Sequence, residues 1–361
     1  MIKPYLAFAL QTATYGCKHR RDIKHNIAHL GRQIDAAMYI SQIEYPTRLI
    51  ALPEGALQGF YDEHARLDHQ TICRDIAIEV PGEETALLAE KAKQWNVYII
   101  AQAKVLEPSI AKDRFFNAAF IISPSGEIIH KHHKSRVFIA EGTTTPFDVH
   151  DAWTSKVGDG LQSFYPVADT PIGRIGTLIC YEGRFPESGR LLAMNGAEII
   201  YRATQVEFHT TLGYWELQNR GHALNNCCYV VSPNNGPKYF STEDQTPSAT
   251  GGAGGKSMII NYRGQIMCEV DGVNVSYAAA IINVEELRSY RTESRYNPLV
   301  ALIPELWSRL YAKAAERFPW PKNLYAERAL GYEERKATFD AVADQMVKNG
   351  VLRRPGTEET A

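Results

Sequence analysis

Short apolar runs of strand length alternate along the chain with longer stretches in which apolar residues recur at helical spacing. This alternation predicts a layered α/β fold, in which helices cover the faces of sheets. The expected helices include residues 22–42, 82–95 and a helix that starts at Pro186 and ends at Gly196. The expected strands include residues 5–11, 47–54, 97–105 and 173–180, together with a hairpin over 117–134 that turns at Ser125-Gly126.

The alternation continues to about residue 285, which predicts one α/β domain over residues 1–285. Residues 286–361 are charged and helical in pattern, and tryptophans and prolines interrupt them. We expect this second segment to be a C-terminal extension that serves packing or contact between subunits.

Composition narrows the range of partners. The chain has 361 residues, a formal net charge of −2 and no long run of like charges, so neither a nucleic acid nor a membrane surface is an expected partner. No stretch approaches the roughly 20 apolar residues that cross a bilayer, and the first residues are too polar for a signal peptide. The six cysteines form no CxxC pair, which indicates reduced thiols and a cytoplasmic protein.

Three predicted strands end in residues that can do chemistry: Glu54, Lys134 and Cys180. In open α/β sheets, sites form beyond the carboxyl ends of strands, so these side chains could share one pocket. A carboxylate there is costly to desolvate unless it is paired, and a lysine could donate to a developing oxyanion. Cys180 lies in "LICYEGRFPE", where acid, arginine and a following helix surround the thiol.

The chain resembles the nitrilase superfamily, the carbon–nitrogen hydrolases with a Glu-Lys-Cys triad, over about residues 5–290. The motifs that carry this resemblance are "LPEGALQGF", "GEIIHKHHK" and "GTLICYEGRFPESGRLLAMNGAEII", of which the last is the most specific. The resemblance implies a four-layer αββα sandwich that pairs into homodimers or larger homo-oligomers.

The resemblance also implies a role for each matched residue. It makes Cys180 the nucleophile, Glu54 the general base and acid, and Lys134 the oxyanion donor. The backbone N–H of Tyr181 would be the second oxyanion donor, and Glu141 falls where the family often has a second glutamate. This mechanism requires no metal and no cofactor.

Two places depart from the family pattern. His132 and His133 stand where an aromatic residue and an arginine usually precede the lysine, and Asn225 replaces a common glutamate. His130 and His132 would share one face of a strand, as metal ligands can, but no carboxylate or cysteine motif accompanies them. We therefore expect no metal site.

Residues after the cysteine favour a branch within the superfamily. The run Tyr181-Glu182-Gly183-Arg184 is similar to amidases and carbamoylases, and Arg202 in "AEIIYRATQ" is similar to the aliphatic amidase and formamidase branch. The predicted activity is hydrolysis of a linear carboxamide to acid and ammonia through a thioester. The alternatives are an N-carbamoyl amine hydrolase, a nitrile-processing enzyme, and a catalytically silent relative that acts in binding or assembly.

Residues near the motifs are candidates for lining a pocket for the small-molecule amide. Trp153 falls in a loop-like stretch that could cover the entrance. The candidates are Phe60, Tyr61, Trp153, Glu182, Arg184 and Thr204.

Overall fold

The computed structural model describes residues 1–205, 212–247 and 254–356, and these residues form two six-stranded sheets and one small strand pair. The first sheet has the order β14-β1-β3-β4-β5-β6, and the second has the order β13-β12-β10-β9-β8-β7. The strands of the first sheet are β1 (Tyr5–Gln11), β3 (Thr47–Ala51), β4 (Tyr98–Leu106), β5 (Phe115–Ile122), β6 (Ile128–His133) and β14 (Ser276–Ile282). Those of the second are β7 (Val167–Thr170), β8 (Gly173–Ile179), β9 (Ile199–Ala203), β10 (Tyr229–Ser232), β12 (Met258–Ile260) and β13 (Ile266–Glu269), and the small pair is β2 (Thr14–Tyr15) and β11 (Lys238–Tyr239).

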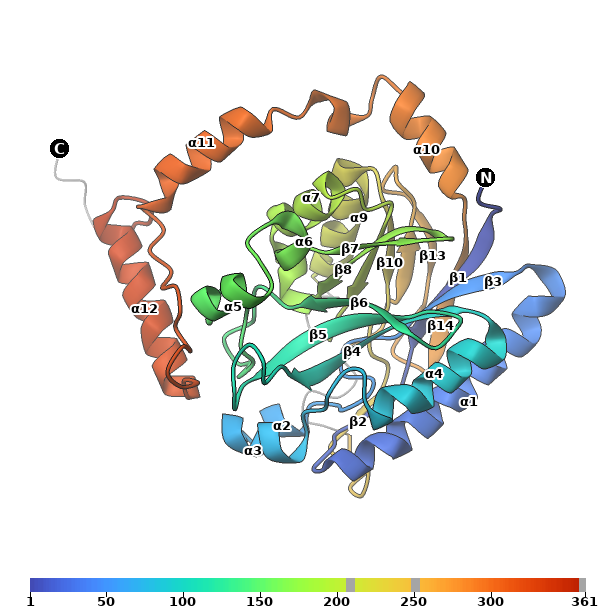
Figure 1. Ribbon diagram of the computed structural model, residues 1–361. Helices are drawn as coiled ribbons and strands as arrows, with labels where there is room; N and C mark the ends of the chain where they lie inside the picture. Colours follow the sequence, from blue (N-terminus) through green and yellow to red (C-terminus); the bar gives the residue numbers. More distant parts are fainter. Residues whose placement is uncertain (206–211, 248–253, 357–361) are drawn as a thin grey trace.

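Alternating side chains along each strand build a layered core. On β1, Phe8 and Leu10 pack with α1 (Arg20–Glu44) and α4 (Glu83–Trp95), whereas Ala7 and Ala9 face the second sheet. The outer face of the second sheet packs on α7 (Pro186–Met194) and α9 (Tyr214–Asn226). The four layers follow the order helices, sheet, sheet, helices, which is the predicted αββα sandwich (Figure 1).

Most of the expected elements are found, with small changes at their ends. Gly126 turns the β5–β6 hairpin with φ of +86°, and Pro186 is at the start of α7 as expected. The strand expected over residues 47–54 ends at Ala51, so the chain leaves the sheet before Glu54. The described residues also form the short helices α2 (Tyr61–His64), α3 (His69–Asp75), α5 (His150–Lys156) and α6 (Leu161–Phe164).

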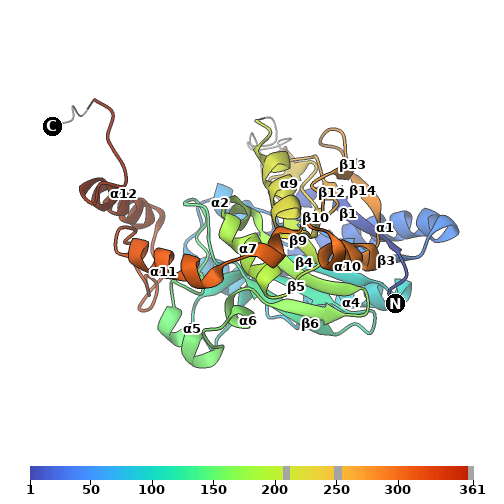
Figure 2. The ribbon, with the colours of Figure 1, turned by 90° about the horizontal axis from the view of Figure 1, so that it is seen from above.

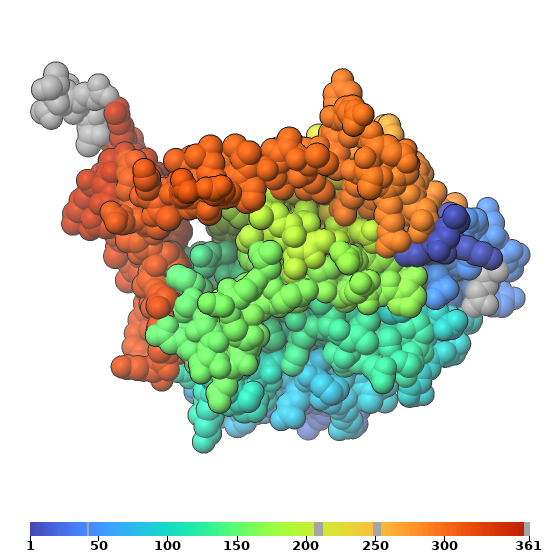
Figure 3. Space-filling model, turned by 45° about the horizontal axis from the view of Figure 1, so that its top comes forward, coloured from blue at the N-terminus to red at the C-terminus, as the bar shows by residue number. Residues whose placement is uncertain are grey.

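The segment after β14 begins on the sandwich and then runs away from it. It consists of α10 (Val284–Glu293), the 3₁₀ turn η2 (Pro298–Ala301), α11 (Pro304–Ala315) and α12 (Tyr332–Lys348). Figure 2 shows α11 and α12 reaching beyond the edge of the sheets, and Figure 3 shows the same segment, orange to red, standing off from the body. No side chain of α11 or α12 is buried.

Several contacts tie the far end of this extension to the body, among them those of Tyr325 and Arg335. Tyr325 is 2% exposed, and its backbone N–H donates to Asp148 O at 2.8 Å. Arg335 on α12 donates through Nε to Ile139 O at 3.2 Å, two residues before Glu141. The extension is therefore packed against the loop that carries Glu141. Among the described residues, no helix is long and apolar enough to cross a membrane.

Candidate active site

The structure brings together the three residues that the sequence placed at strand ends. Glu54 follows β3, Lys134 follows β6, and Cys180 follows β8. Lys134 Nζ lies 2.9 Å from Glu54 Oε1 and 2.6 Å from Glu141 Oε2, so one ammonium joins two carboxylates. The Lys134 side chain is fully buried. A buried lysine is stable only when such partners offset its desolvation.

The two carboxylates keep Lys134 charged. Burial alone would lower the pKa of its ammonium, but the charges of Glu141 and Glu54 outweigh burial and hold the pKa well above its ordinary value. For Glu141, burial raises the carboxyl pKa and the Lys134 charge opposes this rise. The site therefore contains a permanent cation whose Nζ faces carboxylate oxygens.

Cys180 is the first residue of the 3₁₀ turn η1 (Cys180–Arg184) and has a left-handed backbone with φ of +48°. A residue other than glycine in this region costs roughly 1–3 kcal/mol, and such strain is often found at functional positions. The side chain is partly exposed. Burial and the charge of Glu54 raise the pKa of the thiol to about 12, while Lys134 lowers it. The resting group is thus a thiol, and a neighbouring base must take its proton before or during attack.

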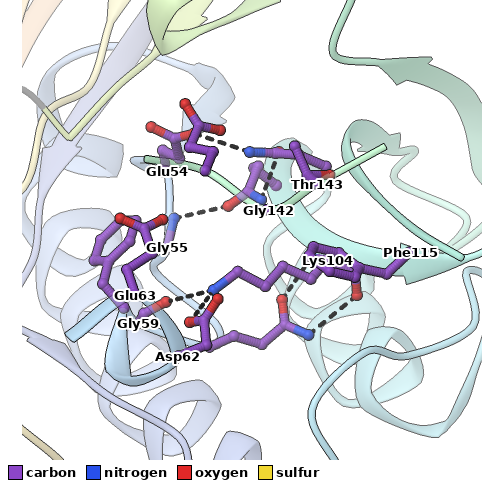
Figure 4. A pocket seen from close by; sticks show the side chains of 14 residues that line it. Glu54, Gly55, Gly59, Asp62, Glu63, Lys104, Phe115, Gly142 and Thr143 are labelled. Atoms are coloured by element: carbon purple, nitrogen blue, oxygen red, sulfur yellow. Dashed lines mark hydrogen bonds and ion pairs between the residues drawn. The ribbon is translucent and has the colours of Figure 1, made fainter. Parts of the chain in front are cut away.

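A ring of buried amides orients the Glu54 carboxylate. Asn117 Nδ2 donates to Glu54 Oε1 at 2.9 Å, and Gln102 Nε2 donates to Asn117 Oδ1 at 2.7 Å. Gly55 N, which is labelled in Figure 4, closes the ring by donating to Gln102 Oε1 at 2.7 Å. The other carboxylate oxygen accepts from Gln205 N at 3.1 Å.

Sequence reasoning missed Gln102 and Asn117. The available signal was an amide side chain in each of two largely apolar strands, "VYIIAQAKV" and "NAAFII". Asn235 was missed as well, although its amide joins the two halves of the site. Its Nδ2 donates to Glu54 O at 2.8 Å and to Thr204 O at 3.2 Å. Each of these amides lets a buried polar group find a partner, as burial requires.

Arg202 lies behind the nucleophile candidate. Its guanidinium is buried, donates to Asn219 Oδ1 at 2.8 Å and to Cys180 O at 3.4 Å, and stacks 4.8 Å from the centre of the Trp215 ring. Gly183 packs against it so closely that an added Cβ would lie 1.9 Å from Arg202 Nε. Arg202 therefore supports the strained turn that begins at Cys180.

Two of the candidate pocket residues lie elsewhere. The structure corrects the expectation for Trp153, which is 2% exposed on helix α5 and packs 4.9 Å from the ring of His133 instead of covering an entrance. Glu182 is fully buried, and its carboxylate accepts from Ser135 N at 2.8 Å and from Ile179 N at 2.9 Å. Its bonds hold the loop after Lys134 to the turn after Cys180, so Glu182 has a structural position.

The remaining candidates surround the site at different depths. Thr204 is fully buried beside the thiol, and its hydroxyl lowers the pKa of Cys180. Phe60 lines a cavity next to Glu54, whereas Tyr61 packs edge-on against Phe240 at 5.3 Å. Arg184 is exposed, with its guanidinium 5.9 Å from the centre of the Tyr181 ring.

The histidines near Lys134 have protein partners. His132 Nε2 lies 3.0 Å from Glu182 Oε2, and His130 Nε2 lies 3.0 Å from Thr177 Oγ1. His133 Nε2 lies 2.9 Å from Glu107 Oε1. Within residues 1–205, 212–247 and 254–356, no group of histidine, cysteine and acidic side chains is arranged to hold a metal ion.

Comparisons with known proteins agree with this fold. The model of the carbon–nitrogen hydrolase family matches residues 11–292. A formamidase of Bacillus cereus is 31% identical over 259 residues, which cover 68% of each chain. A deaminated glutathione amidase of Synechocystis is 25% identical over 296 residues, 81% of this chain and 96% of the relative.

A solved structure shows the same fold. Nit3 of Saccharomyces cerevisiae, a member of branch 10 of the nitrilase superfamily, matches with a TM-score of 0.62 and 22% identity over 81% of this chain and 95% of its own. The chain therefore belongs to the carbon–nitrogen hydrolase family of the nitrilase superfamily. It is a hydrolase that acts on carbon–nitrogen bonds other than peptide bonds.

Proposed function

We propose that this protein hydrolyses a linear carboxamide to a carboxylic acid and ammonia through a thioester on Cys180. The observation that carries the proposal is the position of the Lys134 ammonium, which contacts both Glu54 and Glu141 and acts electrostatically on the Cys180 thiol. Covalent acyl transfer needs a nucleophile, a base and a cation, and Glu54 and Lys134 both act electrostatically on the Cys180 thiol.

The first half of the cycle forms the thioester. Glu54 accepts the Cys180 proton while the sulfur attacks the amide carbon, so a C–S bond forms and the carbonyl oxygen takes up negative charge. Lys134 Nζ and the backbone N–H of Tyr181 donate to this oxyanion, and one such donor is typically worth about 3–4 kcal/mol. Glu54 then returns its proton to the nitrogen, the C–N bond breaks, and ammonia leaves.

The second half of the cycle releases the acid. Glu54 removes a proton from water, and the resulting hydroxide attacks the thioester carbon. The C–S bond breaks and the sulfur regains a proton from Glu54, which restores the starting state. Glu141 acts through Lys134, because its carboxylate holds the ammonium in place.

The relatives support an amide as the substrate. Those named above are a formamidase and a deaminated glutathione amidase, and further relatives are named omega-amidases. The test is ammonia release from formamide, short aliphatic amides, N-carbamoyl amino acids and nitriles in parallel. Fastest turnover of a carbamoyl compound or a nitrile would replace the proposed substrate with one of the two alternative activities.

The matched variant is Cys180→Ala, which removes the sulfur and leaves the ion pairs intact. We expect no turnover, an unchanged circular dichroism spectrum, and loss of the acyl-enzyme mass seen with the unaltered protein after rapid acid quenching. Turnover by Cys180→Ala would refute the thioester mechanism. If the unaltered protein is neither active nor alkylated by iodoacetamide at Cys180, it is a silent relative.

We also propose a homodimer or larger homo-oligomer. The support is the extension, where large apolar side chains are open to solvent in the single chain, such as Leu310 at 52% and Tyr311 at 61% exposed. Such a surface would be covered by a second copy. Analytical ultracentrifugation of the full chain tests this proposal. We expect a dimer or a larger species, and a monomer would contradict it.

A further inference from the structure

A narrow cavity lies beside Glu54 and Glu141. Its volume is about 20 Å³, which is room for about one water-sized group. Glu54, Glu141 and Phe60 line it, together with side chains that the proposed reaction does not use. Figure 4 shows these additional side chains, which include Asp62, Glu63, Lys104 and Thr143.

The charges around this cavity do not balance. Lys134 is shared by Glu54 and Glu141, and Lys104 is held by Asp62 and by Gly59 O. Within the described part of the chain, the Glu63 carboxyl has no ion pair and no hydrogen bond. Four carboxyl groups therefore meet two ammonium groups, which disfavours a further carboxylate and favours a cation.

Two further observations indicate a ligand here. Burial and the charge of Asp62 raise the pKa of the Glu63 carboxyl to about 8, so a cation beside it would favour its ionised form. Thr143 lines the same cavity and is only 3% exposed, and its Oγ1 has no hydrogen-bond partner. An ammonium group offers three hydrogen-bond donors. These donors suit the Glu63 carboxylate and the Thr143 hydroxyl oxygen, neither of which has a hydrogen-bond donor among the described residues.

We propose that this cavity holds the end of the acyl chain and that the preferred substrates are short carboxamides whose chain ends in an ammonium group. This inference rests on the proposed function. In a primary amide the leaving group is ammonia, so the part of the substrate that reaches past Glu54 belongs to the acyl chain. Glu63 and Thr143 bind that end group and set the specificity.

Three amides of equal chain length test the inference: β-alaninamide, butyramide and succinamate, which end in an ammonium, a methyl and a carboxylate. We expect kcat/KM for β-alaninamide to exceed that for butyramide at least about tenfold, with succinamate slowest. In Glu63→Gln the ratio of the first two should fall to about threefold or less. Glu316→Gln, the same change at an exposed glutamate of the extension, should keep the original ratio.

The outcomes separate the two proposals. If butyramide is hydrolysed and β-alaninamide is no faster, or if succinamate is fastest, the ammonium preference is overturned while the amidase activity stands. If a nitrile or a carbamoyl compound is turned over and none of the three amides is, the proposed amidase function is wrong, and the ammonium preference that rests on it is withdrawn with it. The three rates of the unaltered protein decide the matter even if Glu63→Gln does not fold.

Discussion

The amide of Asn117 gives the sharpest test of how the site is oriented. Asn117→Ala removes the donor that contacts Glu54 Oε1 at 2.9 Å and the acceptor that receives Gln102 Nε2 at 2.7 Å. Asn117 is 5% exposed, so water does not readily replace either bond. Glu54 keeps its contacts to Lys134 and Gln205, so the carboxylate remains in the site but is free to turn.

The structure sets the size of the effect. A hydrogen bond to a charged group is worth about 1.5–3 kcal/mol, and each 1.4 kcal/mol is tenfold, so kcat/KM for a short amide should fall about 10- to 150-fold. The Gln102 amide loses its partner in the core, which should lower the free energy of unfolding by about 1–3 kcal/mol. The loss should include a fall in kcat, because the base is free to turn, and KM should change as well, because Asn117 lines the cavity beside Glu54.

Asn26→Ala is the matched control. Asn26 is 2% exposed and its Nδ2 donates to Tyr15 O at 2.9 Å and Leu57 O at 2.8 Å, outside the site. Both variants should lose stability in urea unfolding, but only Asn117→Ala should lose turnover per folded molecule. If kcat/KM of Asn117→Ala stays within threefold of the unaltered protein, the amide ring does not orient the base and the reasoning is wrong.

Three further predictions follow from other parts of the site. Because the pKa of the Cys180 thiol is raised to about 12, the rate of its alkylation by iodoacetamide should rise about tenfold per pH unit between pH 7 and 9. An alkylation rate that levels off below pH 8 would contradict this. Burial opposes ionisation of Glu182, but His132 and hydrogen bonds from Ser135 hold its carboxyl pKa below the ordinary 4.5. Glu182→Gln should therefore lower the free energy of unfolding, measured in urea at pH 7, by about 2–3 kcal/mol. The difference in unfolding free energy between the variant and the unaltered protein should shrink as the pH falls below 4.5. A difference that stays constant with pH argues against an ionised Glu182. Gly183→Ala would place a Cβ 1.9 Å from Arg202 Nε and should lower both Tm and kcat. Gly221→Ala is the control: its added Cβ has no atom within 4 Å, so kcat should not change. If the two variants behave alike, the turn tolerates crowding.

The residues that sequence reasoning found share one property, which is a strong local signal. Glu54 and Cys180 each follow an apolar run, and Lys134 ends the second strand of a hairpin whose Ser125-Gly126 turn can be recognised from the sequence. Trp153 was misplaced because "DVHDAWTSK" has the composition of a loop, although packing of its indole on His133 stabilises a helix there. Local composition could not reveal that contact, since Trp153 and His133 are 20 residues apart in the sequence.

The sequence by itself determined the elements, the layered α/β class, the family and the three strand ends that meet, because hydrophobic periodicity and motif spacing are local properties. Only the tertiary structure decided how the base is held and what lies beside it. Gln102 and Asn117 meet because β4 and β5 pair with Lys104 opposite Asn117, and a slip of one residue would turn one amide to the other face. The cavity that Glu63 and Thr143 line likewise depends on tertiary packing, because helix α2 carries Glu63 and the segment between β6 and α5 carries Thr143, and the two are far apart in the sequence.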